Sequence, residues 1–225
     1  MLKHSMKRYL PFAIVATVAF VAVGSGITLY RAKRLPALTV SKDVALDRSG
    51  AAIHVRGPTD APVTLEEFGD FQCPPCGRLA GAISQMEQDY HPHLRVIFRD
   101  FPLAVHQHAH EAALAAEAAG LQGNFWEMHD LLYREQSAWS TAPDAQLLFE
   151  RYAGVIGLDV ARFKKDMESE QVKARVAADQ RHGTSLGVTS TPAIFINGQP
   201  LTPSALNPSG LRAAIDAAIK SRPTG

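Results

Sequence analysis

The two cysteines of this chain, Cys73 and Cys76, are separated by two prolines, and no other cysteine occurs among the 225 residues. A bridge that closes so short a loop restrains the unfolded chain very little, so a purely structural disulfide is disfavoured. A closed tetrahedral zinc site needs four ligands, two of which would have to come from distant histidines. Two thiols at this spacing are instead typical of a redox pair that alternates between dithiol and disulfide. A metal site and a pair of inert cysteines remain as alternatives at this point.

The residues around the cysteines predict the elements that position them. Residues 62–68 have the pattern of a strand, and residues 94–99 have the pattern of a second strand. Between them, from Cys76 to residue 90, apolar side chains recur at helical spacing. Pro74 and Pro75 suit the first turn of a helix, where a missing N–H costs least. The sequence therefore predicts a βαβ unit in which the cysteine motif opens the helix.

A helix N-terminus would make Cys73 the reactive thiol of the pair. Free N–H groups and the helix dipole favour a thiolate there, and comparable sites have a thiol pKa of about 3.5–7.5 instead of ~8.5. We therefore predict that Cys73 is the exposed nucleophile and that Cys76, one turn further, is the shielded resolving thiol. Proline at position 75 supplies neither the donor nor the cation that histidine would supply. The pKa of Cys73 is then depressed less, which indicates a weaker oxidant.

The rest of the chain is mainly helical before it returns to strand. Helical patterns dominate residues 104–186, and Asp159 is placed to cap one of these helices. Residues 193–196 predict a short strand, and Asn197-Gly198 is a strong hairpin signal that leads into a return strand at residues 199–201. A last helix is expected at residues 208–220. No internal repeat or low-complexity tract is present.

The N-terminus and the composition restrict where the protein works. Residues 9–30 carry no charge and follow Lys3, Lys7 and Arg8. As a helix these residues would span about 33 Å, enough to cross a bilayer. We interpret residues 1–30 as an uncleaved signal anchor, with a cleaved signal peptide as the alternative, and residues 31–50 as a tether. The 23 basic and 22 acidic residues nearly balance, so a nucleic-acid partner is not expected.

Four stretches of the sequence resemble the DsbA-like thiol:disulfide oxidoreductases, a family of the thioredoxin superfamily. They are residues 63–76 (VTLEEFGDFQCPPC), residues 99–103 (RDFPL) with His108-Ala109-His110, residues 122–130 (QGNFWEMHD), and residues 187–198 (GVTSTPAIFING). The resemblance covers roughly residues 50–220. It implies an α/β thioredoxin fold with a helical insertion at about residues 104–186, within a domain at residues 51–225. The Pro-Pro pair departs from the Pro-His of the best-known oxidase of this family.

The resemblance also implies roles for residues outside the cysteine motif. Thr191 and Pro192 would form a cis-proline loop against the cysteines, where a substrate backbone adds as a strand. Ser190 of this loop is a candidate substrate-binding residue. Glu67 is the candidate buried acid that relays protons to Cys76, and we expect it, and not Glu66, to face inward.

Two further sets of side chains have competing interpretations. Phe71 flanks the active site and is the aromatic residue we expect to be exposed to substrate. His106 and His110 would lie on one helical face, with His108 between them, which is compatible with metal binding. Because no Glu-x-x-His companion is present and the family carries histidines here, we expect these histidines to be structural and the protein to hold no metal.

The sequence leads to one main hypothesis about function. We expect an exported disulfide oxidase, monomeric and anchored in the cytoplasmic membrane, that acts on cysteine-containing proteins of the periplasm or cell envelope. Its redox centre would be the Cys73–Cys76 disulfide, without a separate cofactor, and a membrane or soluble redox partner would recycle it. A disulfide isomerase or reductase is the main alternative. A non-catalytic holdase and a copper-handling protein are further alternatives.

Overall fold

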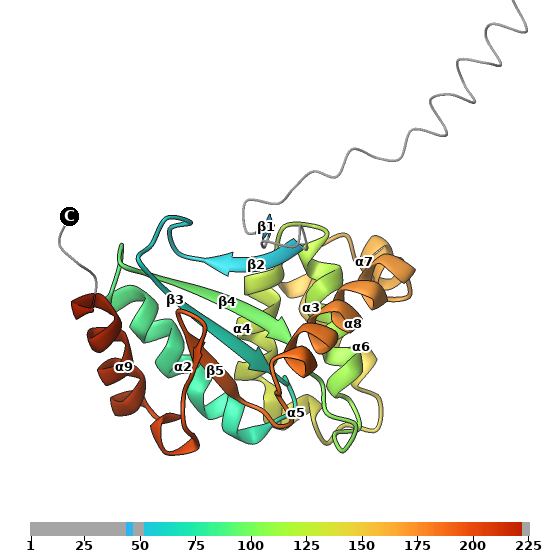
Figure 1. Ribbon diagram of the computed structural model, residues 1–225. Coiled ribbons are helices and arrows are strands. Elements are labelled where there is room, and N and C mark those ends of the chain that lie inside the picture. The colour runs from blue at the N-terminus through green and yellow to red at the C-terminus, as the bar shows by residue number, and fades with distance from the viewer. Residues whose placement is uncertain (1–43, 47–51, 222–225) are drawn as a thin grey trace, which may run out of the picture. The chain divides into compact units, whose positions relative to one another are not determined.

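A computed structural model describes residues 44–46 and 52–221 of the chain (Figure 1). The expected membrane anchor at residues 9–30 lies outside the described residues, as does the expected tether except for residues 44–46. Within the described ranges, no helix combines the length and the apolar character needed to cross a membrane.

The centre of the fold is a mixed sheet with the strand order β1-β2-β4-β3-β5-β6. Its strands are β1 (Val44–Leu46), β2 (Ala52–Arg56), β3 (Val63–Gly69), β4 (Leu94–Asp100), β5 (Ala193–Ile196) and β6 (Gln199–Pro200). Strands β3 and β4 are parallel, and helix α2 (Pro74–Asp89) connects them. All other neighbouring strands are antiparallel. The predicted βαβ unit is therefore confirmed, and β1 shows that part of the expected tether belongs to the sheet.

A run of helices lies between β4 and β5, as predicted. They are α3 (Ala109–Gly120), α4 (Phe125–Arg134), α5 (Gln136–Trp139), α6 (Ala145–Val155), α7 (Val160–Met167) and α8 (Glu170–Ser185). The last two helical elements of the described residues are the 3-10 turn η1 (Pro203–Ala205) and helix α9 (Pro208–Lys220). Asp159 caps α7 by accepting from the Arg162 N–H. The short elements α5 and η1 are the helical segments that periodicity did not predict.

The alternation along β3 sends its side chains to two faces of the sheet. Leu65 belongs to the large core that includes helices α2 and α9, whereas Phe68 belongs to a smaller cluster with Phe101 and Phe195. Helix α8 covers the second face through Gly183. A Cβ atom at Gly183 would lie only 2.8 Å from the Phe101 ring, so glycine permits this close packing. The active-site helix α2 and helix α8 therefore cover opposite faces.

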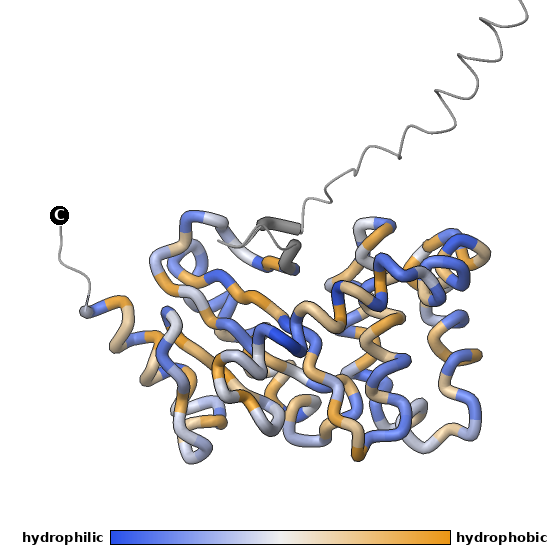
Figure 2. The backbone as a smooth tube through the Cα atoms, turned by 45° about the vertical axis from the view of Figure 1, so that its right-hand side comes forward, coloured by the Kyte–Doolittle hydropathy of each residue, from blue (hydrophilic) through white to orange (hydrophobic). Residues whose placement is uncertain are grey.

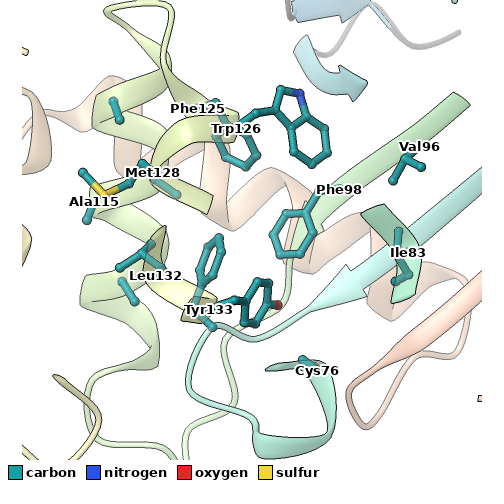
Figure 3. Close-up of a cluster of buried hydrophobic side chains, with 14 of the residues drawn as sticks. Cys76, Ile83, Val96, Phe98, Ala115, Phe125, Trp126, Met128, Leu132 and Tyr133 are labelled. Carbon is teal, nitrogen blue, oxygen red and sulfur yellow. The ribbon is translucent and has the colours of Figure 1, made fainter. Parts of the chain in front are cut away.

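The large core also joins the insertion to the thioredoxin part of the chain. Figure 2 shows hydrophobic segments concentrated along the central strands and the inner helices, with hydrophilic segments in the outer loops. Figure 3 shows Phe125 and Tyr133 of α4 beside Phe98 of β4, and Met128 and Leu132 on the opposite side of α4, near Ala115 of α3. All of these side chains are buried. Helix α4 is therefore fixed between the sheet and α3.

Candidate active site

Cys73 opens helix α2, as the sequence predicts. It is the N-cap residue, with an extended backbone at φ −71° and ψ 119°, and Pro74 and Pro75 begin the helix. The Cys73 N–H donates to the Asp70 carbonyl at 3.0 Å, and the Cys73 carbonyl accepts from the Gly77 N–H at 3.2 Å. These two bonds place the thiol at the positive end of the helix dipole.

Cys73 is nevertheless less exposed than expected. Its exposed fraction is 4%, and that of Cys76 is 0%. The expectation of an exposed nucleophile is therefore wrong in degree, because the loop that contains Thr191 covers the thiol. The Cys73 Sγ donates to the Thr191 carbonyl oxygen at 3.4 Å. The expected shielding of Cys76 is confirmed.

The pKa values of the two thiols are shifted in opposite directions. A hydrogen bond from the Cys76 thiol is the main cause that lowers the pKa of Cys73 to about 6. A side-chain interaction with Thr191 and the Cys76 N–H act in the same direction, while burial and the charge of Asp70 oppose them. Burial is the main cause that raises the pKa of Cys76 far above its usual range. At neutral pH the thiolate therefore forms on Cys73, which is the residue at the helix terminus.

Glu67 lies on the same face of the sheet as α2, and its exposed fraction is 2%. Glu66 is half-buried on the other face, where its Oε1 accepts from Arg99 Nε at 2.9 Å. The prediction that Glu67 is the inward glutamate is confirmed. Burial and, to a smaller degree, the charge of Cys73 raise the pKa of Glu67 to about 8. This carboxyl therefore holds a proton at neutral pH.

Tyr133 is a third polar group near these two residues that sequence reasoning missed. Its hydroxyl is buried and has no hydrogen-bond partner within the described ranges. Burial raises the pKa of Tyr133 well above its usual value, and the charges of Cys76 and Glu67 act in the same direction. Figure 3 shows the ring between Phe98 and Cys76. A Cβ atom at Gly69 would lie 2.4 Å from the Phe98 ring and 2.9 Å from this hydroxyl, so glycine permits the close packing here.

The Thr191–Pro192 peptide bond is cis, which confirms the predicted loop conformation. Pro192 is buried, Thr191 is half-buried and Ser190 is exposed. Beside this loop lies a groove of about 400 Å³, and Pro192 forms part of its wall. Its other lining residues are Pro75, Arg78, Leu79, Pro203, Leu206, Asn207 and Pro208. The cysteine helix, the cis-proline loop and the start of α9 thus enclose one groove.

Phe71 does not belong to the exposed surface. Its exposed fraction is 1%, and its ring lies 5.0 Å from the Tyr133 ring and 5.1 Å from the Phe98 ring. The expectation that Phe71 contacts substrate is therefore wrong. The turn after β3 directs this ring back under α4, where the burial of an aromatic side chain is more favourable than exposure. Phe71 supports the active-site turn from inside the core.

Polar side chains of the insertion hold the active-site turn from outside. Gln136 Nε2 in α5 donates to the carbonyl oxygens of Phe71 at 2.6 Å and Cys73 at 3.0 Å. Gln72 Nε2 donates to the Ser140 carbonyl at 3.0 Å. The sequence pattern did not indicate Gln136, because a single glutamine in a four-residue helix carries no periodic signal.

The histidines that resembled a metal site are separated in the structure. Helix α3 begins at Ala109, so His106 lies in the preceding loop and does not share a helical face with His110. His106 Nδ1 is 2.7 Å from Asp70 Oδ2, and His108 Nε2 is 3.0 Å from the Ala142 carbonyl. These two histidines therefore connect the loop to the active-site turn and to the insertion.

One buried acidic cluster has atoms close enough to hold a cation. Its members are Asp100, Glu117 and Asp179, which lie on β4, α3 and α8. Arg99 Nη1 donates to Asp179 Oδ1 at 2.9 Å, and Arg175 pairs with Glu117. Guanidinium groups therefore pair with Asp179 and Glu117, and these two carboxylates belong to an ion-pair network between the sheet and the insertion.

Three comparisons to known proteins agree with this fold. The family described as Thioredoxin matches residues 50–217, which is more than half of the chain. A thioredoxin-like oxidoreductase from Silicibacter pomeroyi superposes with a TM-score of 0.62 at 28% identity, covering 76% of this chain and 94% of that chain. Pseudomonas aeruginosa DsbA2 superposes with a TM-score of 0.58 at 25% identity, covering 74% and 94%. Oxidised BdbD from Bacillus subtilis, at 22% identity, shares the fold with a TM-score of 0.66 over 74% and 92%.

The curated relatives are much longer than the part that matches. The protein named Na(+)/H(+) antiporter NhaA 1 of Salinispora arenicola is 43% identical over 147 residues, which is 65% of this chain and 22% of that protein. The protein of the same name from Mycolicibacterium gilvum is 40% identical over 151 residues, 65% and 23%. The chain thus spans less than a quarter of these relatives. On the family match and the solved structures, the chain belongs to the thioredoxin superfamily, among its DsbA-like thiol-disulfide oxidoreductases.

Proposed function

We propose that this protein is a disulfide oxidase for proteins outside the cytoplasm. The observation that carries the proposal is the placement of Cys73. Its thiol lies at a helix N-terminus, 3.4 Å from the carbonyl of the cis-proline loop, with its pKa lowered to about 6. A thiolate in this position is both a nucleophile and a good leaving group in disulfide exchange.

The proposed cycle has two halves. In the first, a substrate thiolate attacks Cys73 of the Cys73–Cys76 disulfide, the bond between the two cysteines breaks, and Cys76 leaves and gains a proton. A second substrate thiolate then attacks the mixed disulfide, and Cys73 leaves as a thiolate. In the second half, a disulfide-containing partner accepts attack by Cys73, and Cys76 resolves that mixed disulfide. The redox centre needs no separate cofactor.

The groove beside the site supports a role with extended substrates. It is lined by prolines and leucines on both sides, and Arg78 adds one cation. An extended chain that pairs with the backbone at Thr191 and Ser190 would place its cysteine against Cys73. Apolar walls with few charges admit many sequences, which suits an enzyme that acts on many proteins.

The lowered pKa supports an oxidase over a reductase. A stabilised thiolate stabilises the reduced form, and a protein with a more stable reduced form is a stronger oxidant. The value of about 6 for Cys73 lies between thioredoxin at about 7 and DsbA at about 3.5. We therefore place the reduction potential between about −270 mV and about −120 mV.

The equilibrium reduction potential in a glutathione buffer tests this proposal on the full chain. A potential above about −180 mV would support a protein that donates disulfides and is recycled by an oxidising partner. A potential near −270 mV would identify a reductase or isomerase, the alternative that the sequence left open, and would reject the oxidase.

The proposal also includes the location and the membrane attachment. The uncharged residues 9–30 would anchor the domain, as a monomer, to the cytoplasmic membrane and place it in the periplasm or cell envelope. Fractionation of cells that express the full chain tests the anchor, because a cleaved signal would release a shorter, soluble form.

A further inference from the structure

A narrow cavity lies on the face of the sheet that carries Glu67. Helices α2 and α4 and strands β2, β3 and β4 supply its walls. Its water-accessible volume is about 10 Å³, which is the space of about one water molecule. The buried side chains of Glu67 and His129 line it, together with the half-buried Arg56, Ser84 and Glu87. The cavity therefore extends from the acid beneath the cysteines to side chains near the surface.

Two buried polar atoms in this cavity lack a hydrogen-bond partner among the residues that the structure describes. They are Glu67 Oε1 and His129 Nε2. Buried polar atoms of this kind are normally satisfied by protein groups or by ordered water. One water molecule in the cavity would satisfy both atoms and link the two side chains.

The protonation states of these two residues are complementary. His129 Nδ1 is 2.8 Å from Asp130 Oδ1, a carboxylate that can only accept, so Nδ1 carries the hydrogen and Nε2 has a free lone pair. Burial lowers the pKa of His129 and raises that of Glu67 to about 8. The cavity is thus lined by a protonated carboxyl and a neutral imidazole. The other titratable or charged groups that face the imidazole are Arg56, His54 and Tyr133.

Asp130 connects this pair to solvent. Its side chain is 46% exposed, and Oδ2 accepts from Arg56 Nη2 at 2.7 Å. A proton that reaches the imidazole at Nε2 can therefore be replaced by one that leaves from Nδ1 through Asp130. With one water molecule between Glu67 and His129, this route would run from the core to the surface.

We propose that His129 and Asp130 form the proton outlet of Glu67, joined to it by one water molecule in this cavity. The inference rests on the proposed thiol-disulfide exchange. It concerns the step that restores the Cys73–Cys76 disulfide after Cys73 has attacked an oxidising partner. His129 acts through Glu67, and it touches neither sulfur in this step.

The atoms balance as follows. The Cys76 sulfur forms a bond to the Cys73 sulfur, and the partner sulfur departs as a thiolate with the electrons of the broken bond. Glu67 gives its own proton to the cavity water, the water gives one to His129 Nε2, and Nδ1 releases one through Asp130 to solvent. The Glu67 carboxylate formed in this way takes the Cys76 proton, so Glu67 ends the step protonated again and one proton has left the protein. The disulfide partner is the oxidant, and no further co-reactant is needed.

The test follows the reduced full chain after it is mixed with oxidised glutathione. Acid quenching and mass measurement separate the glutathione adduct on Cys73 from the closed disulfide. His129→Gln retains hydrogen bonding but does not carry a proton. We expect closure at pH 7 to slow at least about tenfold, imidazole buffer to restore it, and adduct formation, measured on the Cys76→Ser protein, to stay unchanged.

His110→Gln is the matched control, because His110 is exposed on α3, and we expect it to close at the parent rate. Equal closure rates for His129→Gln and the parent chain from pH 6 to 9 would overturn the proton outlet. If His129→Gln does not fold, Asp130→Asn takes its place, and an unchanged rate would again overturn it. If the parent chain itself forms no Cys73–Cys76 disulfide, the proposed function fails instead.

Discussion

Glu67 holds a proton because its carboxyl is enclosed by the sheet, α2 and α4, and this has a cost in stability. Its pKa rises from about 4.5 in the unfolded chain to about 8 in the folded protein. Between these two values the folded state binds more protons than the unfolded state, so the free energy of unfolding falls as the pH rises through this window. Below about pH 4.5 this loss is absent.

Glu67→Gln should therefore stabilise the reduced protein at pH 9 by an amount on the order of 3 kcal/mol, and by much less at pH 4.5. Urea unfolding at the two pH values measures the difference. Glu66→Gln is the control, because it removes an ion-pair partner of Arg99 and should not stabilise the protein at either pH. A gain for Glu67→Gln that is the same at both pH values would contradict the raised pKa.

Pro75 lies exposed in the first turn of α2, two residues from the reactive thiol. Pro75→His adds an N–H donor and a partial positive charge near Cys73, so we expect the pKa of Cys73 to fall below about 6 and the reduction potential to rise. Thiolate absorbance at 240 nm, followed against pH, measures the pKa. Pro75→Ala restores the N–H without the imidazole and should give a smaller change. An unchanged pKa in both variants would show that position 75 does not act on the thiolate.

At the scale of elements, the short helix α5 fixes the turn that carries Cys73. Gln136→Ala removes two hydrogen bonds to buried carbonyl oxygens, at Phe71 and Cys73. We expect the free energy of unfolding to fall by about 1–3 kcal/mol, measured by urea unfolding of the reduced protein. Gln146→Ala, on the exposed side of α6, should change it by less than about 0.5 kcal/mol. Equal effects of the two substitutions would mean that α5 does not support the turn.

The longer elements were predictable because their patterns extend over several turns or a full strand. The sequence predicted β3, β4, α2, α9 and most of the insertion, since periodicity and capping residues agree there. Elements α5, η1 and β1 were missed, because three or four residues cannot show a period. Their positions depend on contacts with distant parts of the chain.

At the site, the sequence predicted the residues that local chemistry defines, and it failed where tertiary packing decides. The location of Cys73 follows from the helix start, and the cis bond at Pro192 follows from the resemblance. Phe71 is buried and His106 lies outside α3 because the turn after β3 and the loop before α3 pack against α4 and the active-site turn. No pattern in either segment reports that packing.

At the scale of the whole molecule, Arg99 joins the sheet to α8. Its exposed fraction is 3%, and it pairs with Glu66 and Asp179 at 2.9 Å each. Arg99→Ala leaves the buried Asp179 and the half-buried Glu66 without their cation, and we expect the free energy of unfolding to fall by about 3–5 kcal/mol. Arg95→Ala, in the same strand but half-buried, is the control and should cost about 1 kcal/mol. Urea unfolding that shows equal losses would reject the network as a major stabilising contact.

The recessed position of Cys73 limits when the proposed enzyme can work. In the reduced form described here, 4% of the surface of Cys73 is open, which leaves little access for a cysteine fixed on the surface of a rigid domain. A cysteine on a chain that is still unfolded can bend into the groove and reach it. A substrate protein that has finished folding would therefore no longer reach Cys73. Disulfide formation by the enzyme would have to occur before the substrate protein folds.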